Sequence, residues 1–194
     1  SGTFAFVITS ENDAPSISFN NGLTLLEGAS STISSNLITA TDPDNTNAEI
    51  LFDFVSFVAS GNLYLSGNSV SVSDNFTQSD LNSWLLSYTH DDSETTSDAF
   101  VVTITDSIAA VSSNVTFAIT VTPVNEAPVI SGTPGLSVTA GASYSFTPSV
   151  ADVDSGDSCT YSMSGAPSTI TLTGTTISGT PVNANVGTHT IVVT

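Results

Sequence analysis

Short hydrophobic runs alternate with polar turn segments along most of this chain. The runs are rich in Val, Ile, Thr, Phe and Tyr, and the clearest of them cover residues 100–106, 116–122, 143–150 and 188–194. Between them stand clusters of Gly, Asn, Asp, Ser and Pro, which favour turns. Many short strands at regular spacing are typical of antiparallel sandwiches, so the pattern predicts an all-β fold.

One stretch has the pattern of a helical turn. In TQSDLNSWLL (77–86), a Thr or Ser cap precedes the apolar residues Leu81, Trp84 and Leu85. A lone Trp in an apolar cluster usually belongs to a core, although its ring can also stack on a sugar. We therefore expect Trp84 to be buried.

The chain repeats itself, and the repeats predict its domains. TFAFVITSENDAP (3–15) aligns without a gap with TFAITVTPVNEAP (116–128), and ATDPDN (40–45) has a partner in VADVDS (150–155). The predicted order is the last strand of a preceding repeat (1–10), a linker (11–15), a first sandwich (16–122), a second linker (123–128), and a second sandwich lacking its final strand (129–194).

Residues 3–10 allow two interpretations. They match the last strand of the first sandwich, so the favoured interpretation is the last strand of an upstream domain in a longer array. The alternative is a strand donated to the second sandwich of another subunit, since an added strand satisfies an otherwise exposed sheet edge. Donation of this kind would build a filament.

The charge is entirely acidic. The chain has 18 Asp and Glu residues, no Lys or Arg, and a formal net charge of −18. Such a chain repels itself and needs screening or neutralisation from outside. Nucleic acid is excluded as a partner because phosphates need cationic side chains. No apolar run approaches the roughly 20 residues of a membrane helix, so we expect no membrane-embedded segment. The single Cys159 alternates with Tyr161 and Met163, which predicts a small buried side chain, with an interchain disulfide as the alternative.

Several motifs in the first sandwich carry a family resemblance. They are LTLLEGAS (23–30), LITATDPDN (37–45), FTQSDLNSWLLSYTHDDSETTSDAFVVTITD (76–106) and TFAITVTPVNEAP (116–128). With them, residues 16–125 resemble the repeat of chondroitin sulfate proteoglycans, a cadherin-like module also common in giant bacterial surface proteins. Asp92 departs from the family, which usually has Gly there, and Glu126 stands where Asp is usual.

The second sandwich has a resemblance of its own. On residues 140–174 and 177–194 it is similar to dystroglycan-type cadherin-like, or putative immunoglobulin-like, bacterial repeats. Asn185 stands where that family frequently has Asp. Together the two resemblances imply tandem cadherin/immunoglobulin-like β-sandwiches of a large extracellular or cell-surface protein, with calcium at the junctions.

Carboxylate spacing agrees with calcium. The ion takes 6–8 oxygen ligands at about 2.3–2.6 Å. In an extended loop, side chains two positions apart point the same way, so Asp42 and Asp44 can face one ion, and Asp152 and Asp154 repeat the pattern. A single Asp-x-Asp pair is an ordinary polar turn. Here two such pairs each follow a matching Asn-acid-Ala-Pro linker at a similar distance, and the chain has no Lys or Arg. Together these features favour calcium binding over ordinary turns.

The resemblance to cadherin-like modules also implies which residues form each junction. The first would use Asn12, Asp13, Asp42, Asp44 and Asp106. The second would use Glu27, Asp92 and Glu94 of the first sandwich, Asn125 and Glu126 of the linker, and Asp152 and Asp154 of the second sandwich.

These observations predict a calcium-stiffened spacer or stalk of a large surface adhesin, with neighbouring repeats, identical subunits, glycans or cell surfaces as partners. The alternatives are a filament or surface-layer subunit assembled by strand donation, and a carbohydrate-binding module. The latter needs an aromatic platform, and only 8% of residues are aromatic. We expect no enzyme: His90 stands beside Asp91 and near Ser93, but neighbours in one turn rarely reach triad geometry.

Overall fold

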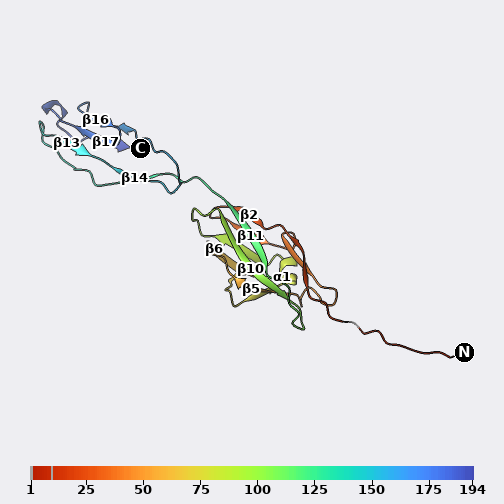
Figure 1. Cartoon of the computed structure of the whole chain (residues 1–194). Helices are drawn as coiled ribbons and strands as arrows, with labels where there is room; N and C mark the ends of the chain where they lie inside the picture. The colour runs from red at the N-terminus through yellow and green to blue at the C-terminus, as the bar shows by residue number, and fades with distance from the viewer. Residues whose placement is uncertain (1, 10) are drawn as a thin grey trace. The chain divides into compact units, whose positions relative to one another are not determined.

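A computed structural model describes residues 2–9 and 11–194, and the chain divides into two compact units, Ser1–Val124 (unit 1) and Asn125–Thr194 (unit 2). Both are built from β-strands, which confirms the predicted all-β fold (Figure 1). Within the described residues, no helix has the length and apolarity to span a membrane.

Unit 1 is a sandwich of two main sheets. The first has the order β2-β11-β10-β5-β8, and the second has the order β3-β9-β6-β7. A separate pair, β1 and β4, is antiparallel, and β11 pairs with β2 in parallel. The strands are β1 (Ser16–Asn20), β2 (Leu23–Leu26), β3 (Ser30–Ile33), β4 (Ile38–Thr41), β5 (Leu51–Ser56), β6 (Gly61–Leu65), β7 (Asn68–Ser69), β8 (Asn75–Thr77), β9 (Leu86–His90), β10 (Ser97–Thr105) and β11 (Val115–Thr122).

Period-two alternation builds the core of unit 1. On β10, Phe100, Val102 and Ile104 are fully buried, while the residues between them are only partly buried. Buried side chains of the second sheet, such as Tyr88 on β9, join the same hydrophobic cluster. Successive strand residues point to opposite faces, so one face of each sheet meets the other in a shared core.

Helix α1 (Gln78–Asn82) begins as the sequence predicts. The Thr77 hydroxyl accepts a hydrogen bond from the Asp80 N–H, and the Asp80 carboxylate accepts one from the Thr77 N–H. This reciprocal pair satisfies two N–H groups that the helix leaves unpaired.

The expectation that Trp84 is buried is wrong. Its side chain is 61% exposed, whereas Leu81 and Leu86 on either side of it are fully buried. Trp84 has a φ of 61°, so the chain turns sharply there. That turn carries Leu86 back to the core and leaves the indole ring in solvent.

Unit 2 has three small sheets, with the orders β12-β14, β13-β17-β16 and β15-β18. The predicted strand at 143–150 is two strands, because buried Pro148 between them has no N–H to donate. The elements are β12 (Val129–Ser131), β13 (Tyr144–Phe146), β14 (Ser149–Ala151), β15 (Met163–Ser164), β16 (Ile170–Thr173), β17 (Thr176–Gly179), the 3-10 helix η1 (Asn183–Asn185) and β18 (Val192–Val193).

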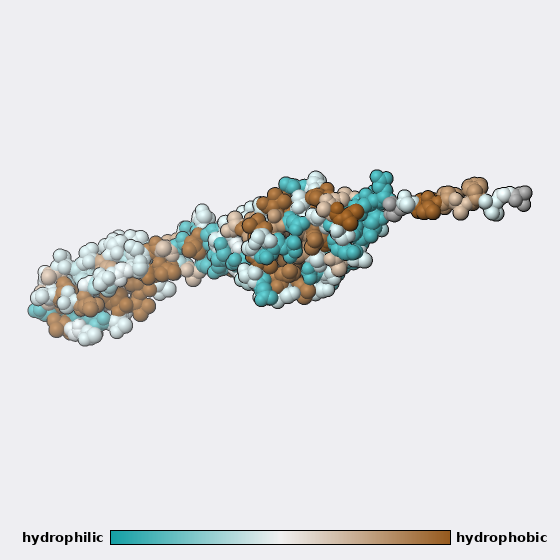
Figure 2. Space-filling model, turned by 90° about the horizontal axis from the view of Figure 1, so that it is seen from below, coloured by the Kyte–Doolittle hydropathy of each residue, from teal (hydrophilic) through white to brown (hydrophobic). Residues whose placement is uncertain are grey.

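Residues 2–9 make no strand pairing with the rest of the described chain. Their apolar side chains, including Phe4, Phe6 and Ile8, are exposed. Figure 2 shows this segment as a run of mostly hydrophobic residues. Ser1 and Ser10, the two ends of the strand predicted at 1–10, lie outside the described residues.

Candidate metal sites

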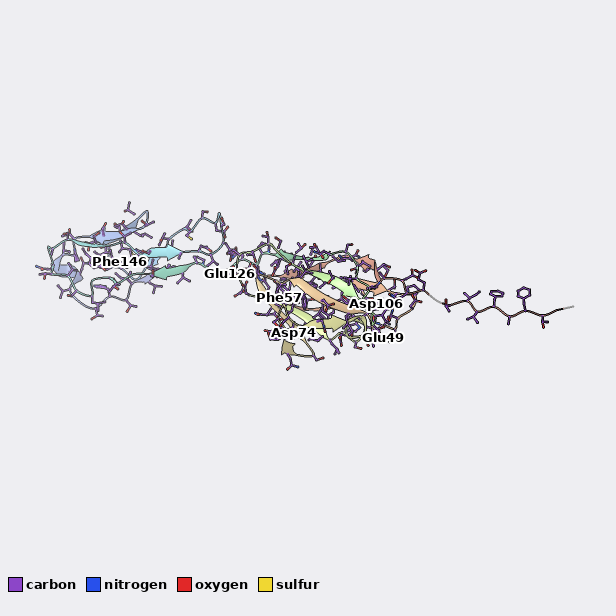
Figure 3. All side chains as sticks on the ribbon, turned by 60° about the horizontal axis from the view of Figure 1, so that its bottom comes forward. Glu49, Phe57, Asp74, Asp106, Glu126 and Phe146 are labelled. Carbon is purple, nitrogen blue, oxygen red and sulfur yellow. The ribbon has the colours of Figure 1, made fainter. Side chains whose placement is uncertain are left out.

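Three loops meet at one end of unit 1, where the N-terminal segment joins the sandwich. They are the predicted linker at 11–15, the loop that follows β4, and the turn that follows β10. The residues predicted for the first junction lie on these loops, and Figure 3 labels Asp106 at this end of the unit. Hydrogen bonds connect all five of them, Asn12, Asp13, Asp42, Asp44 and Asp106.

Asp42 organises the loop after β4. Its Oδ1 accepts hydrogen bonds from the N–H groups of Asp44 at 2.8 Å and Asn45 at 3.0 Å. This is an Asx-turn, in which a short side chain replaces a backbone acceptor. The other oxygen, Oδ2, is buried and has no hydrogen-bond partner among the described residues.

The linker docks onto these loops through both backbone and side chain. The Asp13 N–H donates to Asp44 Oδ2 at 2.9 Å, and the Asn12 amide donates to Asp106 Oδ2 at 2.6 Å and to the Asp13 carbonyl at 3.0 Å. These bonds join residues that are far apart in the sequence: Asp13 and Asp44 are separated by 31 positions, and Asn12 and Asp106 by 94. The arrangement fixes where the linker leaves the sandwich.

Asp106 is the buried acid of this group. Besides the bond from Asn12, its Oδ1 accepts the N–H groups of Ile108 at 3.0 Å and Ala110 at 2.8 Å. The Asn12 hydrogen bond, followed by these backbone donors, lowers the pKa of the Asp106 carboxyl although burial opposes the shift. The structure therefore holds Asp106 as a carboxylate.

The acids predicted for the first junction do not converge on one point as a group of three. Among the described residues, no three of its acids bring ligand atoms within 4.8 Å of one another. The loops are assembled instead through hydrogen bonds to backbone N–H groups.

Unit 2 repeats the same bonds at its own N-terminal linker. The Glu126 N–H donates to Asp154 Oδ2 at 2.8 Å, and the Asp154 N–H donates to Asp152 Oδ1 at 3.2 Å. The Asn125 amide donates to the Glu126 carbonyl at 2.8 Å, as Asn12 does to Asp13. The repeat found in the sequence is therefore a repeat of local geometry.

Cys159 lies beside this second loop and is half-buried, so it is less buried than the sequence predicts. Its Sγ is 3.8 Å from Asp152 Oδ2, a contact that holds the thiol at the surface of the acidic loop. Burial, with the neighbouring charge of Asp152, raises the pKa of the thiol.

The remaining predicted residues of unit 1 lie near the ends of β2 and β11. Glu27 is buried, its N–H donates to the Thr122 carbonyl at 2.9 Å, and its Oε2 accepts from the Val124 N–H at 3.3 Å. Its Oε1 is buried without a hydrogen-bond partner in the described part of the chain. One carboxylate oxygen of Glu94 lies within 4.8 Å of one from Glu27.

Asp92 contacts the same region through Gly28. A Cβ added at Gly28 would collide with Asp92 Oδ1, so the close approach depends on glycine. Asp92 itself has a φ of 66°, a backbone conformation that Gly adopts more easily than a residue with a Cβ.

Sequence reasoning missed the part that His90 plays here. The buried ring accepts a hydrogen bond at Nδ1 from the Gly28 N–H at 3.3 Å, and its Nε2 lies 2.9 Å from Thr95 Oγ1. His90 thus links the turn after Glu27 to the loop that carries Glu94. Its place in an alternating strand, two positions after buried Tyr88, was the available signal.

Comparison with known proteins agrees with this architecture. A model described as cadherin-like matches residues 15–121, more than half of the chain. The chain belongs to the cadherin-like family. A second model, described as a putative Ig domain, matches residues 127–194, so a cadherin-like domain is followed by an Ig-like one. Both are structural modules rather than typical enzymes, and cadherin-like domains generally bind calcium.

Two human proteins are similar to this cadherin-like chain. FRAS1-related extracellular matrix protein 1 is 33% identical over 106 residues, which are 54% of this chain and 5% of the relative. Extracellular matrix organizing protein FRAS1 is 32% identical over 130 residues, which are 66% of this chain and 3% of the relative. The chain thus spans only a small part of the length of either relative.

Proposed function

We propose that this chain is a calcium-binding repeat segment of a large extracellular protein, acting as a spacer or stalk of a surface adhesin. Membership of the cadherin-like family supports calcium binding. Similarity to two proteins named for the extracellular matrix supports an extracellular location. The resemblance of residues 16–125 to modules of bacterial surface proteins also implies a location on a bacterial cell surface, and we include that location in the proposal.

The observation that carries the calcium proposal is the buried, unpartnered Oδ2 of Asp42. Burying a carboxylate oxygen without a hydrogen bond is costly, and the described residues include no Lys or Arg to compensate. A divalent cation offsets that cost. Glu27 Oε1 presents the same unpaired oxygen near the end of β2.

The donor set fits a hard cation. All twelve predicted residues offer carboxylate or amide oxygens, which Ca²⁺ prefers to nitrogen or sulfur. Asp42, Asp44, Asp13 and Asp106 would hold an ion at the first linker, with the Asn12 carbonyl oxygens as further ligands. Asp152, Asp154, Glu126 and Asn125 would take the equivalent places at the second.

The positions of these residues support a stiffening role for calcium. Each linker is already attached to the acidic loop of its own unit by hydrogen bonds from Asp13 or Glu126. An ion that also bound groups of an adjoining repeat, such as Glu27 and Glu94 of a preceding domain, would restrain the hinge. Affinities of about 10⁻⁴–10⁻³ M are usual for extracellular calcium modules.

Calorimetric titration with calcium tests the binding. We expect heat from the wild-type chain, less heat or weaker binding in Asp42→Asn and Asp152→Asn, and unchanged binding in the control Asp74→Asn. The control removes one charge from a turn where Asp74 binds only Ser71 and which belongs to neither loop (Figure 3). Equal effects of all three variants would attribute binding to general anionic charge, and no heat at millimolar calcium would end the proposal.

Glycan recognition is a second candidate, favoured by the exposed ring of Trp84. It is the only tryptophan of the chain, so its fluorescence reports directly on a stacked sugar. A glycan array would select ligands, and their binding should change Trp84 emission. An array without hits, or hits that leave the emission unchanged, would reject the candidate.

A further inference from the structure

Asn45 connects two of the loops that carry the candidate ligands of the first linker. Its side-chain Nδ2 donates to Asp42 Oδ1 at 3.2 Å, and its Oδ1 accepts a hydrogen bond from the Ser107 hydroxyl at 2.6 Å. Asn45 lies with Asp42 on the loop after β4. Ser107 lies in the turn after β10, next to Asp106. Neither Asn45 nor Ser107 is among the twelve residues that the sequence predicts to hold calcium.

The chemistry of the side chains fixes the direction of this bridge. A carboxylate can only accept hydrogen bonds, so the Asn45 amide turns its NH₂ group to Asp42. Its carbonyl oxygen is then left to accept from the Ser107 hydroxyl. Both polar ends of the Asn45 side chain are therefore in use within unit 1.

The bridge also fixes the carboxylate of Asp42. Its Oδ1 accepts the backbone N–H groups of Asp44 and Asn45 together with the Asn45 amide. Three donors on one oxygen hold the plane of the carboxylate. The second oxygen, Oδ2, stays buried and has no hydrogen-bond partner in the described part of the chain. The oxygen left over is the one on which the calcium proposal depends.

The two bridged loops follow strands of different sheets. Strand β4 pairs with β1, whereas β10 lies in the five-stranded sheet, and no pairing joins β4 to β10 among the described residues. The linker contacts both loops through Asn12 and Asp13. The bond between Asn45 and Ser107 joins the loops directly, so it holds them together independently of the linker.

Unit 2 shows the same loop without the bridging amide. In the aligned stretches 40–45 and 150–155, Ser155 takes the place of Asn45. The Asp154 N–H still donates to Asp152 Oδ1, at 3.2 Å. The turn within the acidic loop therefore forms with or without the amide, which leaves the bridge of unit 1 with a separate role.

We propose that Asn45 and Ser107 are positioning residues of the first calcium site, an inference that rests on the proposed function. They hold Asp42 and the turn that carries Asp106 in place before an ion binds, so that less ordering is required on binding. Neither residue coordinates the ion. Removing the hydrogen-bond partner of a metal ligand typically weakens metal binding by about tenfold to a hundredfold.

A double-mutant cycle, measured by calorimetric titration with calcium, tests the bridge. The background Asp152→Asn weakens the second site, so that the heat reports on the first. Ser107→Ala should weaken binding about tenfold, and Ser107→Thr, which keeps the hydroxyl, should stay within about threefold. In an Asn45→Ala chain, adding Ser107→Ala should change nothing further, because the partner of the hydroxyl is already gone. Asn68→Ala is the control, since that amide donates to the Ser66 carbonyl in a hairpin turn that belongs to neither loop.

Hydrogen exchange in chelator reads the same bridge without calcium. Ser107→Ala should speed the exchange of the Asp44 and Asn45 N–H groups, which bond to Asp42, by at least about threefold. The exchange of β10 and the midpoint of urea unfolding should stay as in the wild type. A residue that served only overall stability would change both of these instead.

The outcomes separate this inference from the proposed function. No heat from the wild-type chain would end both. Heat that Ser107→Ala leaves unchanged would overturn the positioning role alone. A further loss of about tenfold when Ser107→Ala is added to Asn45→Ala would also overturn it, since the two residues would then act separately. Unchanged exchange of the Asp44 and Asn45 N–H groups in Ser107→Ala would do the same.

Discussion

Asp42 and Asp106 show how single carboxylates organise the loops at the N-terminal end of unit 1. Asp42 closes an Asx-turn with one oxygen and keeps the other buried, while Asp106 accepts two backbone N–H groups and the Asn12 amide. Both acids stabilise backbone geometry before any cation binds. The same carboxylates thereby serve the fold and the proposed metal site.

The lowered pKa of Asp106 predicts a pH dependence. A carboxyl whose pKa is lower in the folded chain stabilises the fold above its ordinary value of 3.8, and this contribution is lost as the pH falls below that value. In chelator, wild type should unfold at a higher temperature than Asp106→Asn at pH 7, and the difference should shrink by pH 3. Calorimetric scans at the two pH values measure it, and a constant difference would contradict the assignment.

Asp92 predicts a stabilising substitution. Its φ of 66° is unfavourable for a residue with a Cβ and costs Gly nothing, so Asp92→Gly should raise the free energy of unfolding by about 1 kcal/mol. Urea unfolding without calcium measures the gain, with Asp91→Gly as the control at a neighbouring position where φ is not positive. A loss of stability in Asp92→Gly would show that the side chain, not the backbone, decides this position.

Among the secondary-structure elements, helix α1 depends for its stability on the hydrogen bonds of its first turn. The Thr77 and Asp80 hydrogen bonds satisfy backbone donors that five residues of helix cannot satisfy alone. Thr77→Ala should lower the free energy of unfolding by about 1 kcal/mol, whereas Thr77→Ser, which keeps the hydroxyl, should cost much less. Equal losses in urea unfolding would show that the Thr77 methyl group matters and the cap does not.

Leu81 within α1 and Trp84 just after it predict opposite effects of substitution on stability. Leu81 is fully buried, so Leu81→Ala should cost about 2–5 kcal/mol. Trp84→Ala should change the stability by no more than about 0.5 kcal/mol because the ring is in solvent. A large loss in Trp84→Ala would support the burial that the sequence alone predicted.

The elements that the sequence predicted are those with strict alternation. Strands β10 and β11 and the cap of α1 follow from local patterns, and the repeat pointed to both acidic loops. Trp84 was misjudged because a left-handed turn is invisible in hydropathy. The docking of Asp13 on Asp44 depends on a tertiary approach that no spacing encodes.

Charge acts at the scale of the whole molecule. With a formal charge of −18 and no cationic side chain, every pair of neighbouring repeats repels, and only ions from solution can change that. Divalent ions in the loops would both reduce the charge and restrain the linkers.

Small-angle X-ray scattering of the chain tests the central claim most directly, namely that calcium restrains the linkers. It compares the chain in chelator with the chain at calcium several-fold above about 10⁻³ M. We predict that calcium narrows the distribution of the chain's dimensions and gives a defined maximum length, and that Asp152→Asn abolishes this change. Superimposable profiles with and without calcium would contradict the account.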